Sequence, residues 1–246
     1  MTFSSSFLPE KVKRPLRPIR TMGRRLRLRW NTAVRAPNGA PTLDLSDEAL
    51  RRVLVALELR RPISRPRSVE VGSGWAPQRG YVHIDVDPAA PDIDLTARGT
   101  RLPIPDAWAT QLLSIHMIEH VPPGQLGATF AEWHRVLMPG GSLSLHTPNG
   151  NSIAAALVRQ ETFWPAQGAI FGYGRSPKEY LRPEDLGDSP GHRIVFTFEI
   201  LRDLLESNGF VSVWDMSGKH PCYHHTGWAP YIENLCLEIT ARKPGP

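Results

Sequence analysis

The chain has 246 residues, of which 41% are hydrophobic and 22% are charged, a length and balance typical of one sizeable folded domain with appendages. No apolar run approaches the ~18–20 residues of a membrane span, and the first residues lack the apolar stretch of a secretory signal, so we expect a cytoplasmic protein. The two cysteines suit a reducing cytosol and provide no disulfide framework.

The net charge of +5 is unevenly distributed along the chain. Between Lys11 and Leu43 there are ten Lys/Arg and no Asp/Glu, whereas the chain from Asp44 onward holds 19 Lys/Arg against 23 Asp/Glu. Only the N-terminal part is therefore basic, and the basic balance of the whole chain is poor evidence that the body binds nucleic acid. We predict a flexible basic arm over residues 1–43 and a folded domain over residues 44–246.

The arm carries one weak pattern. Met22, Leu26, Trp30 and Val34 recur every fourth residue among arginines. This pattern is compatible with a short basic amphipathic helix that makes weak peripheral contact with an anionic membrane. The alternative is a solvated tail without fixed structure, because four apolar anchors make a marginal helix.

Beyond the arm, helix-like and strand-like segments alternate. A helix is predicted over 46–60, where Ser46 can cap the first turn, and further helices are predicted over 124–137 and 197–208. Alternation of this kind favours an open, mainly parallel α/β sheet, and the two closing strands favour an antiparallel edge. The predicted strands cover residues 68–72, 81–86, 91–95, 110–115, 142–147, 210–215 and 234–241.

The first predicted strand runs into a glycine turn, Glu70-Val-Gly72-Ser73-Gly74. Two glycines at this place let the backbone turn tightly and approach a ligand. A third glycine and a phosphate-loop lysine are both absent, which disfavours dinucleotides and nucleoside triphosphates. Asp85, thirteen residues after Gly72, ends the next strand and can accept hydrogen bonds from two ribose hydroxyls. An adenosine-type ligand fits this arrangement, and an ordinary tight turn is the alternative.

The fourth predicted strand is followed by His116-Met-Ile-Glu119-His120, an H-x-x-E-H string. On a helix of two turns, this spacing builds the metal site of one class of zinc peptidase. Here Pro122-Pro123 follows at once and leaves no room for two turns, and no third protein ligand is apparent downstream. We therefore interpret the string as the lip of a ligand pocket rather than as a metal site.

Two later segments contain candidate site residues. Within a predicted acceptor-lid insertion around 151–191, aromatic side chains can cover a ligand. A second cluster, His220-Pro-Cys222-Tyr-His224-His225, has irregular spacing for a metal site and is interpreted as a loop near the mouth of the site. The aromatic residues of the insertion are Phe163, Trp164, Phe171, Tyr173 and Tyr180.

The order of the motifs resembles class I S-adenosylmethionine-dependent methyltransferases, in particular the bacterial branch with a short first turn and an "EH" after the fourth strand. The likeness covers residues 68–150 well and 192–241 moderately. It rests on the glycine turn, His83-Ile-Asp85-Val-Asp-Pro, Leu102-Pro-Ile-Pro, Ile118-Glu-His-Val and Arg135-Val-Leu-Met-Pro-Gly-Gly. The resemblance implies a Rossmann-like fold with a mainly parallel seven-stranded sheet and an antiparallel edge strand.

The resemblance also implies roles for individual residues. Glu70 and the turn of Gly72, Ser73 and Gly74 are expected to hold the methionine end of S-adenosylmethionine. Asp85 is expected to hold the ribose, Asp94 is expected to lie near the adenine, and His116 is expected near the reactive methyl group. The first helix of the family must be reduced to a turn here, because only about nine residues separate the first two strands.

The expected activity is methylation of a small molecule or glycan, most consistent with O-methylation of a sugar or secondary metabolite. A hydroxyl acceptor benefits from a general base, for which His116 is the first candidate, His192 the second and His120 the third. Glu119 is expected to orient a neighbouring histidine rather than to take the proton. The alternatives are a nucleic-acid methyltransferase, which the acidic body disfavours, and a non-catalytic protein that binds the cofactor.

Overall fold

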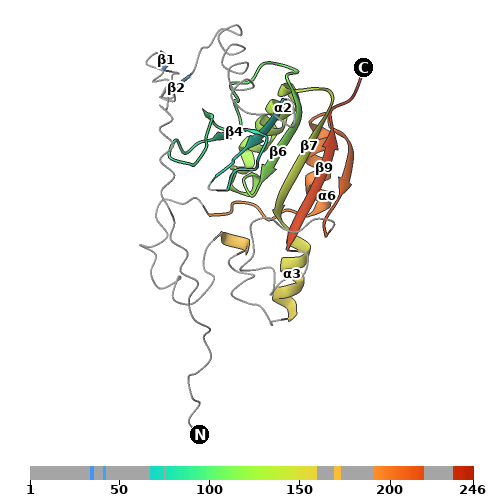
Figure 1. The fold of residues 1–246 in the computed structure, drawn as a ribbon. Helices are drawn as coiled ribbons and strands as arrows, with labels where there is room; N and C mark the ends of the chain where they lie inside the picture. Colours follow the sequence, from blue (N-terminus) through green and yellow to red (C-terminus); the bar gives the residue numbers. More distant parts are fainter. Residues whose placement is uncertain are drawn as a thin grey trace, which may run out of the picture. The chain divides into compact units, whose positions relative to one another are not determined.

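The computed structural model describes residues 34–35, 41–42, 67–74, 76–159, 169–172, 191–218 and 235–246 (Figure 1). The chain divides into two units, Met1–Asp44 and Leu45–Pro246. In the first unit, β1 (Val34–Arg35) and β2 (Pro41–Thr42) pair antiparallel. The predicted amphipathic pattern of the arm lies mostly outside the described residues, and the helix predicted over 46–60 lies entirely outside them.

The second unit is built on a seven-stranded sheet with the order β5-β4-β3-β6-β7-β9-β8. The five strands from β5 to β7 run parallel, and β9 runs antiparallel to both of its neighbours, β7 and β8. The prediction of a mainly parallel, Rossmann-like sheet with antiparallel pairing at one side is confirmed. The strands are β3 (Ser68–Val71), β4 (Val82–Asp85), β5 (Leu95–Thr96), β6 (Ala109–Ile115), β7 (Leu137–Pro148), β8 (Val211–Asp215) and β9 (Cys236–Arg242).

Two strands differ from their predicted bounds. The strand predicted over 91–95 is reduced to β5, because Asp92 has a left-handed backbone with φ of 53° that ends extended structure there. The strand predicted to begin at residue 142 instead begins at Leu137, which pairs with Ala109 before a register shift. Gly140, with φ of 76°, lies within this irregular first part of β7.

Two helices pack on one face of the sheet (Figure 1). Helix α2 (Leu126–Val136) follows a short 3₁₀ turn, η2 (Pro123–Gln125), and buries one stripe of its surface. Helix α6 (Phe198–Ser207) adds Leu201 and Leu205 to the same core. The spacing of three and four residues within each stripe is the reason that these segments fold as helices against a sheet. The α2 stripe consists of Leu126, Phe130, Trp133 and Val136.

The ends of α6 match the signals in the sequence. The side chain of Thr197 accepts a hydrogen bond from the backbone N–H of Ile200 at 3.4 Å, which caps the first turn. At the other end Gly209 has φ of 86°, and its N–H donates to the carbonyl of Glu206 at 3.0 Å. Gly209 therefore ends the helix in the left-handed conformation that glycine adopts readily at this position.

Helix α3 (Gly150–Arg159) was not predicted, and it forms the first part of the proposed lid insertion. Asn149 caps it, since its side-chain oxygen accepts the N–H of Asn151 at 3.1 Å. Asn149 also bridges Phe196, and the N–H of Gly150 donates to the carbonyl of Phe196 at 2.7 Å. The two chain ends that flank residues 151–195 are therefore joined at the sheet.

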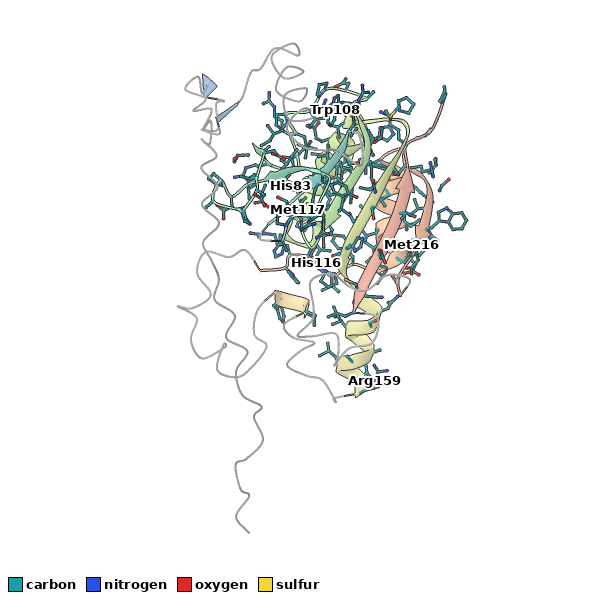
Figure 2. The ribbon with its side chains drawn as sticks, viewed as in Figure 1. His83, Trp108, His116, Met117, Arg159 and Met216 are labelled. Atoms are coloured by element: carbon teal, nitrogen blue, oxygen red, sulfur yellow. The ribbon has the colours of Figure 1, made fainter. Side chains whose placement is uncertain are left out.

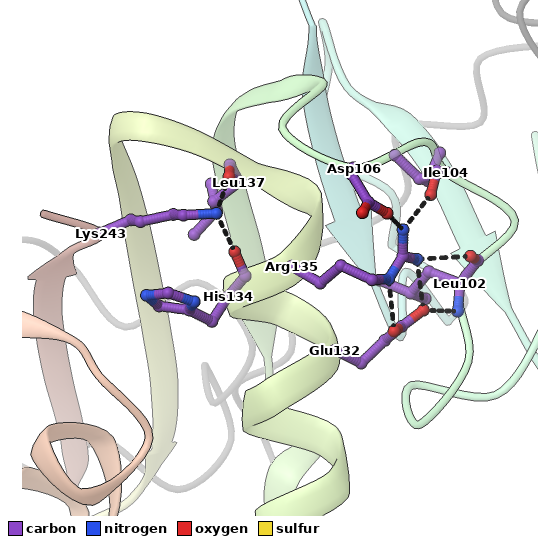
Figure 3. Close-up of polar contacts among 8 residues, drawn as sticks. All are labelled: Leu102, Ile104, Asp106, Glu132, His134, Arg135, Leu137 and Lys243. Atoms are coloured by element: carbon purple, nitrogen blue, oxygen red, sulfur yellow. Dashed lines mark hydrogen bonds and ion pairs between the residues drawn. The ribbon is translucent and has the colours of Figure 1, made fainter. Parts of the chain in front are cut away.

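An arginine on α2 fixes the segment that leads into β6 (Figure 3). The guanidinium of Arg135 donates to the carbonyls of Leu102 at 3.2 Å and Ile104 at 2.9 Å, and it pairs with the carboxylates of Glu132 and Asp106. These charged hydrogen bonds raise the pKa of Arg135 above its usual value, chiefly through Glu132. Leu102 and Ile104 are buried, so this one side chain satisfies carbonyls at the edge of the core.

Within the described residues, no helix is long and apolar enough to cross a lipid bilayer.

Candidate active site

The candidate site lies where three neighbouring parallel strands end. Gly72 follows β3, Val86 follows β4 and His116 follows β6, and these strands are adjacent in the sheet. His116 and Met117 lie at the opposite end of β6 from Trp108 (Figure 2). In open sheets of this type, the carboxyl ends of the strands form the edge at which ligands bind.

The glycine turn is tied to the neighbouring strand β4. The N–H groups of Gly72 and Ser73 donate to the carbonyl of Ile84 at 2.8 and 3.3 Å. Gly72 and Gly74 have φ values of 76° and 52°, which a residue with a side chain adopts only with strain. Both glycines of the predicted turn are therefore required by the backbone itself.

Met117 packs directly over this turn. A Cβ atom added to Gly72 would lie 2.3 Å from Cγ and 2.5 Å from Cβ of Met117, far inside contact distance. A Cβ added to Gly99, after β5, would lie 3.2 Å from Cε of the same side chain. Met117 thus lies between the first turn and the loop after β5, and it links the H-x-x-E-H segment to the turn.

Asp85 holds the turn from the end of β4. One carboxylate oxygen accepts the N–H of Gly74 at 2.8 Å, and the other accepts the N–H of Asp87 at 2.9 Å. An ionised carboxylate has about four acceptor sites, so two backbone bonds leave capacity for ligand hydroxyls. The side chain predicted to bind a ribose is thus fixed beside the glycine turn.

Two buried polar groups belong to β3 and to the turn that follows it. Glu70 is 1% exposed, and its carboxylate accepts the N–H of Gln78 at 2.8 Å. Burial raises the pKa of Glu70 to about 7, against smaller lowering effects of that bond and of His83. The hydroxyl of Ser73 is buried and has no hydrogen-bond partner among the described residues. A carboxylate and an unsatisfied hydroxyl at a strained glycine turn fit a ligand with ammonium and carboxylate ends, as the methionine part of S-adenosylmethionine has.

Asp94 is placed differently from its prediction. It precedes β5 rather than closing that strand, and its carboxylate accepts the backbone N–H of His83 at 2.9 Å. The side chain therefore extends the pairing of β4 beyond the short β5. Its expected position beside the adenine stays a prediction.

On the other side of Met117 lies a group that we call the histidine cluster: His116, Glu119, His120 and His192. Ile118–His120 forms a single 3₁₀ turn, η1, so the two-turn helix of a zinc peptidase is absent from this segment. His192, which is 72 residues after His120, joins the cluster from the segment before α6. The sequence alone named each of these residues, and the fold brings them together.

Glu119 is the buried centre of the cluster, with 0% exposure. Its two carboxylate oxygens contact the ring Nδ1 of His116 at 3.0 Å and the hydroxyl of Thr147 at 3.1 Å. Burial opposes ionisation, but the hydrogen bond with His116 and the charges of His116 and His192 hold the pKa of Glu119 below its usual value. Glu119 is therefore a buried carboxylate that stays ionised.

His192 turns one ring nitrogen toward this carboxylate. Its Nδ1 contacts the carbonyl oxygen of Ala169 at 2.8 Å, and since only an N–H can donate to a carbonyl, Nε2 carries the unshared electron pair. Nε2 lies 4.0 Å from Glu119, and the ring packs edge-on against that of His120, with centroids 4.8 Å apart. Burial lowers the pKa of His192 below its usual value, although Glu119 opposes this effect.

Backbone contacts fix the segment that carries His192. The N–H of His192 donates to the carbonyl of Phe171 at 2.9 Å. The next N–H, of Arg193, donates to the carbonyl of Glu119 at 2.7 Å. The segment before α6 is therefore bonded to η1 directly, which gives the cluster a defined geometry.

His116, the first candidate for a general base, has both ring nitrogens in contact with neighbours. Nδ1 contacts Glu119, and Nε2 lies 3.3 Å from Sγ of Cys236 on β9. Its backbone is left-handed, with φ of 50°, which is uncommon for a residue with a side chain. Cys236 is disulfide-bonded, whereas the sequence predicted cysteines suited to a reducing cytosol and no disulfide framework.

Three contributors to the site were not anticipated from the sequence. Met117 closes over the turn, Thr147 orients Glu119, and the carbonyl of Ala169 orients His192. Each acts through a contact across the fold, for which a linear pattern contains no signal. Of the predicted lid aromatics, Phe171 is described and is 39% exposed. The other four lid aromatics and the segment 220–225 lie outside the described residues.

Comparisons with known proteins agree with this arrangement. Residues 72–145 match a family model described as a methyltransferase domain. A methyltransferase structure from Methanosarcina mazei, described as S-adenosylmethionine-dependent, is 17% identical and covers 77% of this chain and 98% of its own, with a TM-score of 0.52. Curated proteins show no match.

Two further solved structures match this chain with lower TM-scores. One, from Thermotoga maritima, is titled a possible histamine N-methyltransferase; it is 17% identical, covers 79% of this chain and 89% of its own, and has a TM-score of 0.47. The other is 1,6-didemethyltoxoflavin-N1-methyltransferase from Burkholderia thailandensis, with S-adenosylhomocysteine bound. It is 17% identical, covers 80% of each chain and has a TM-score of 0.44.

Residues 72–145 thus match a methyltransferase domain, and the chain has the predicted Rossmann-like fold. The predictions of a methyl-transfer enzyme and of S-adenosylmethionine as its cofactor are confirmed. This activity implies a methyl acceptor.

Proposed function

We propose that this enzyme transfers a methyl group from S-adenosylmethionine to a hydroxyl of a small molecule or glycan, with a sugar or secondary metabolite as the acceptor. The proposal also assigns the chain to the branch with a short first turn and an "EH" after the fourth strand. The observation that carries it is the histidine cluster, whose buried carboxylate Glu119 lies two residues after Met117, the side chain that packs over the glycine turn.

In this proposal one group of residues binds the cofactor and another group acts on the acceptor. Glu70, Ser73 and the turn hold the methionine end of the cofactor, and Asp85 holds its ribose. When bound, the cofactor supplies a methyl group already activated by a positively charged sulfur. The transfer forms an oxygen–carbon bond, breaks the carbon–sulfur bond and releases the hydroxyl proton. The protein must align the acceptor and provide an acceptor for that proton.

The histidine cluster is the group that we assign to the proton. We favour His192 over His116, which the sequence ranked first, because Nε2 of His192 carries an unshared electron pair and faces the cluster. His116 contacts Glu119 and Cys236 through its two ring nitrogens, which suits a residue that positions the carboxylate. Glu119 orients the imidazoles around it, as the sequence suggested.

The experiment supplies the purified protein with S-adenosylmethionine that carries a deuterated methyl group, together with fractionated cell extract. We expect the label in a methyl ether of the small-molecule or glycan fraction, detected by mass spectrometry. The same reaction with Asp85→Ala serves as the control, and it should give no labelled product because the cofactor is bound weakly.

Other outcomes would contradict the proposal. Label that appears only in RNA would support the nucleic-acid alternative. Binding of S-adenosylhomocysteine without any labelled product would support a non-catalytic protein. Label on nitrogen or carbon would retain the methyltransferase and overturn the hydroxyl acceptor.

A further inference from the structure

We propose that Glu119, His120 and His192 form a binding site for one divalent transition-metal ion, which activates the acceptor hydroxyl. This inference deepens the proposed function and, for the role of the ion, rests on it. The sequence argued against a metal site on the H-x-x-E-H string because no third ligand was apparent. The fold supplies that ligand as His192.

The positions of the ligand atoms support the site. One carboxylate oxygen of Glu119 and one ring nitrogen each of His120 and His192 all lie within 4.8 Å of one another. Bonds of about 2.0–2.1 Å place the ligand atoms of a tetrahedral site roughly 3.4 Å apart, so modest side-chain rotation brings these three to bonding distance. Both histidines are partly exposed, so the site can be reached from solvent.

The surrounding contacts are those of oriented ligands. His192 engages the carbonyl of Ala169 through Nδ1, which leaves Nε2 directed at the carboxylate. Metal-binding histidines typically use their second nitrogen in this way, because the bond fixes both the tautomer and the ring plane. Thr147 and His116 likewise hold the two oxygens of Glu119.

The charge of the site also favours a cation. Glu119 is fully buried, and among the described residues no lysine or arginine pairs with it. The charged neighbours of Glu119 are imidazoles alone, and a divalent ion would compensate the buried negative charge further. The Glu119 carbonyl is bonded to the N–H of Arg193, so the ligand-bearing segments are already held together.

Two imidazoles and one carboxylate select the kind of ion. This set suits zinc and its neighbours, such as cobalt, rather than magnesium or calcium, which prefer oxygen ligands alone. Three protein ligands leave a coordination position open for an acceptor oxygen. The ion would lower the pKa of the acceptor hydroxyl, whose proton would pass to water while the oxygen attacks the methyl carbon. Nε2 of His192 would then be a ligand.

The test begins with the full chain after treatment with a chelator. Titration with Zn²⁺ in a calorimeter should show one equivalent bound, and Co²⁺ should give the visible absorption bands of a protein-bound ion. Glu119→Gln and His192→Ala should each weaken Zn²⁺ binding by at least ~10-fold and remove the Co²⁺ bands. His134→Gln, on α2 and outside the cluster, is the matched control and should bind the ion as the wild type does. Binding of S-adenosylhomocysteine confirms that each variant is folded.

The outcomes separate this inference from the proposed function. If no stoichiometric ion binds, or if both variants bind it as tightly as the wild type, the metal site is wrong. Methyl transfer that continues in the metal-free protein overturns the role of the ion and leaves the hydroxyl methyltransferase intact. Transfer that is lost with the ion and restored by Zn²⁺ or Co²⁺ supports both.

Discussion

At the scale of single residues, His192 and His116 present different atoms to the cluster, and this difference predicts unequal effects. We expect His192→Ala to lower turnover by ~10²–10⁴ with cofactor affinity little changed, because it removes the group that activates the acceptor. His116→Ala should lower turnover less, since His116 contacts the cluster through Glu119. Steady-state kinetics with calorimetry of S-adenosylhomocysteine tests this order. If both variants stay within a few-fold of the wild type, alignment alone must explain the rate.

Glu70 predicts that cofactor binding depends on pH. Burial raises the pKa of Glu70 to about 7, so near neutral pH the free enzyme holds a proton there in a large fraction of molecules. An ammonium group beside the carboxylate favours its ionised form and lowers the pKa. Binding should therefore release protons near pH 7, and affinity should increase as the pH rises from about 6 to 8. Calorimetry in two buffers of different ionisation heat measures the release.

The control for this prediction is Glu70→Gln, which keeps an acceptor oxygen for the N–H of Gln78 but has no proton to lose. Its binding should be weaker at pH 8 and should show little dependence on pH over the same range. Equal proton release by the wild type and by Glu70→Gln would assign the effect to another group.

At the scale of elements, the turn between β3 and β4 predicts that Gly72→Ala is damaging. The new methyl group would overlap Met117, and the backbone there is left-handed. We expect a loss of stability on the order of 1–3 kcal/mol and loss of cofactor binding. Gly127→Ala on α2 is the matched control, because nothing lies within 4 Å of its added Cβ. It should leave stability unchanged or raise it by up to about 1 kcal/mol. Thermal denaturation and calorimetry report both quantities.

The link between α2 and the segment before β6 predicts that removing Arg135 destabilises the fold more than removing an exposed arginine on α6. Arg135→Ala removes the donors of two carbonyls and two carboxylates, and because the side chain is one-third exposed we expect only about 1–3 kcal/mol of destabilisation. Arg202→Ala, on α6, removes an exposed pair with Asp203 and should cost less than about 0.5 kcal/mol. Chemical denaturation of the two variants compares them directly, and equal losses would contradict the anchoring role of Arg135.

The helices and strands differ in how well the sequence predicted them. Helices α2 and α6 were predicted within two residues, because a buried stripe and end signals such as Gly209 are local. Helix α3 was missed, since its apolar stripe is short and its cap, Asn149, follows a proline. The short β5 was overestimated because the left-handed backbone at Asp92 is set by its surroundings.

At the scale of the whole molecule, the order of the motifs predicted the sheet, whereas it did not predict that the cluster residues meet. The sequence listed His116, Glu119, His120 and His192 as separate candidates. Their meeting depends on the bond between Arg193 and Glu119, which joins segments more than seventy residues apart. The sequence pattern also put Asp94 near the end of a predicted strand, whereas in the structure Asp94 precedes β5.

The uneven charge of the chain supports a prediction about the arm. Residues 11–43 carry ten Lys/Arg and no Asp/Glu, and we propose that this arm makes the weak membrane contact. Deleting residues 1–40 should abolish sedimentation with vesicles of anionic lipid while cofactor affinity stays unchanged. Vesicles of neutral lipid are the control. Equal sedimentation of both forms would show that the arm is not the attachment.

The bridge between Asn149 and Phe196 has a consequence for engineering and for evolution. The intervening segment leaves and re-enters the sheet at adjacent points, with Gly150 bonded to Phe196, and Arg193 fastens its last residues to η1. A different segment placed between α3 and His192 would therefore be attached at the same two points, and the residues proposed to bind the cofactor would be unchanged. Chimaeras that exchange this segment with that of another methyltransferase offer a route to new acceptors. Replacement of the same segment is also a route by which the substrate range can change in evolution.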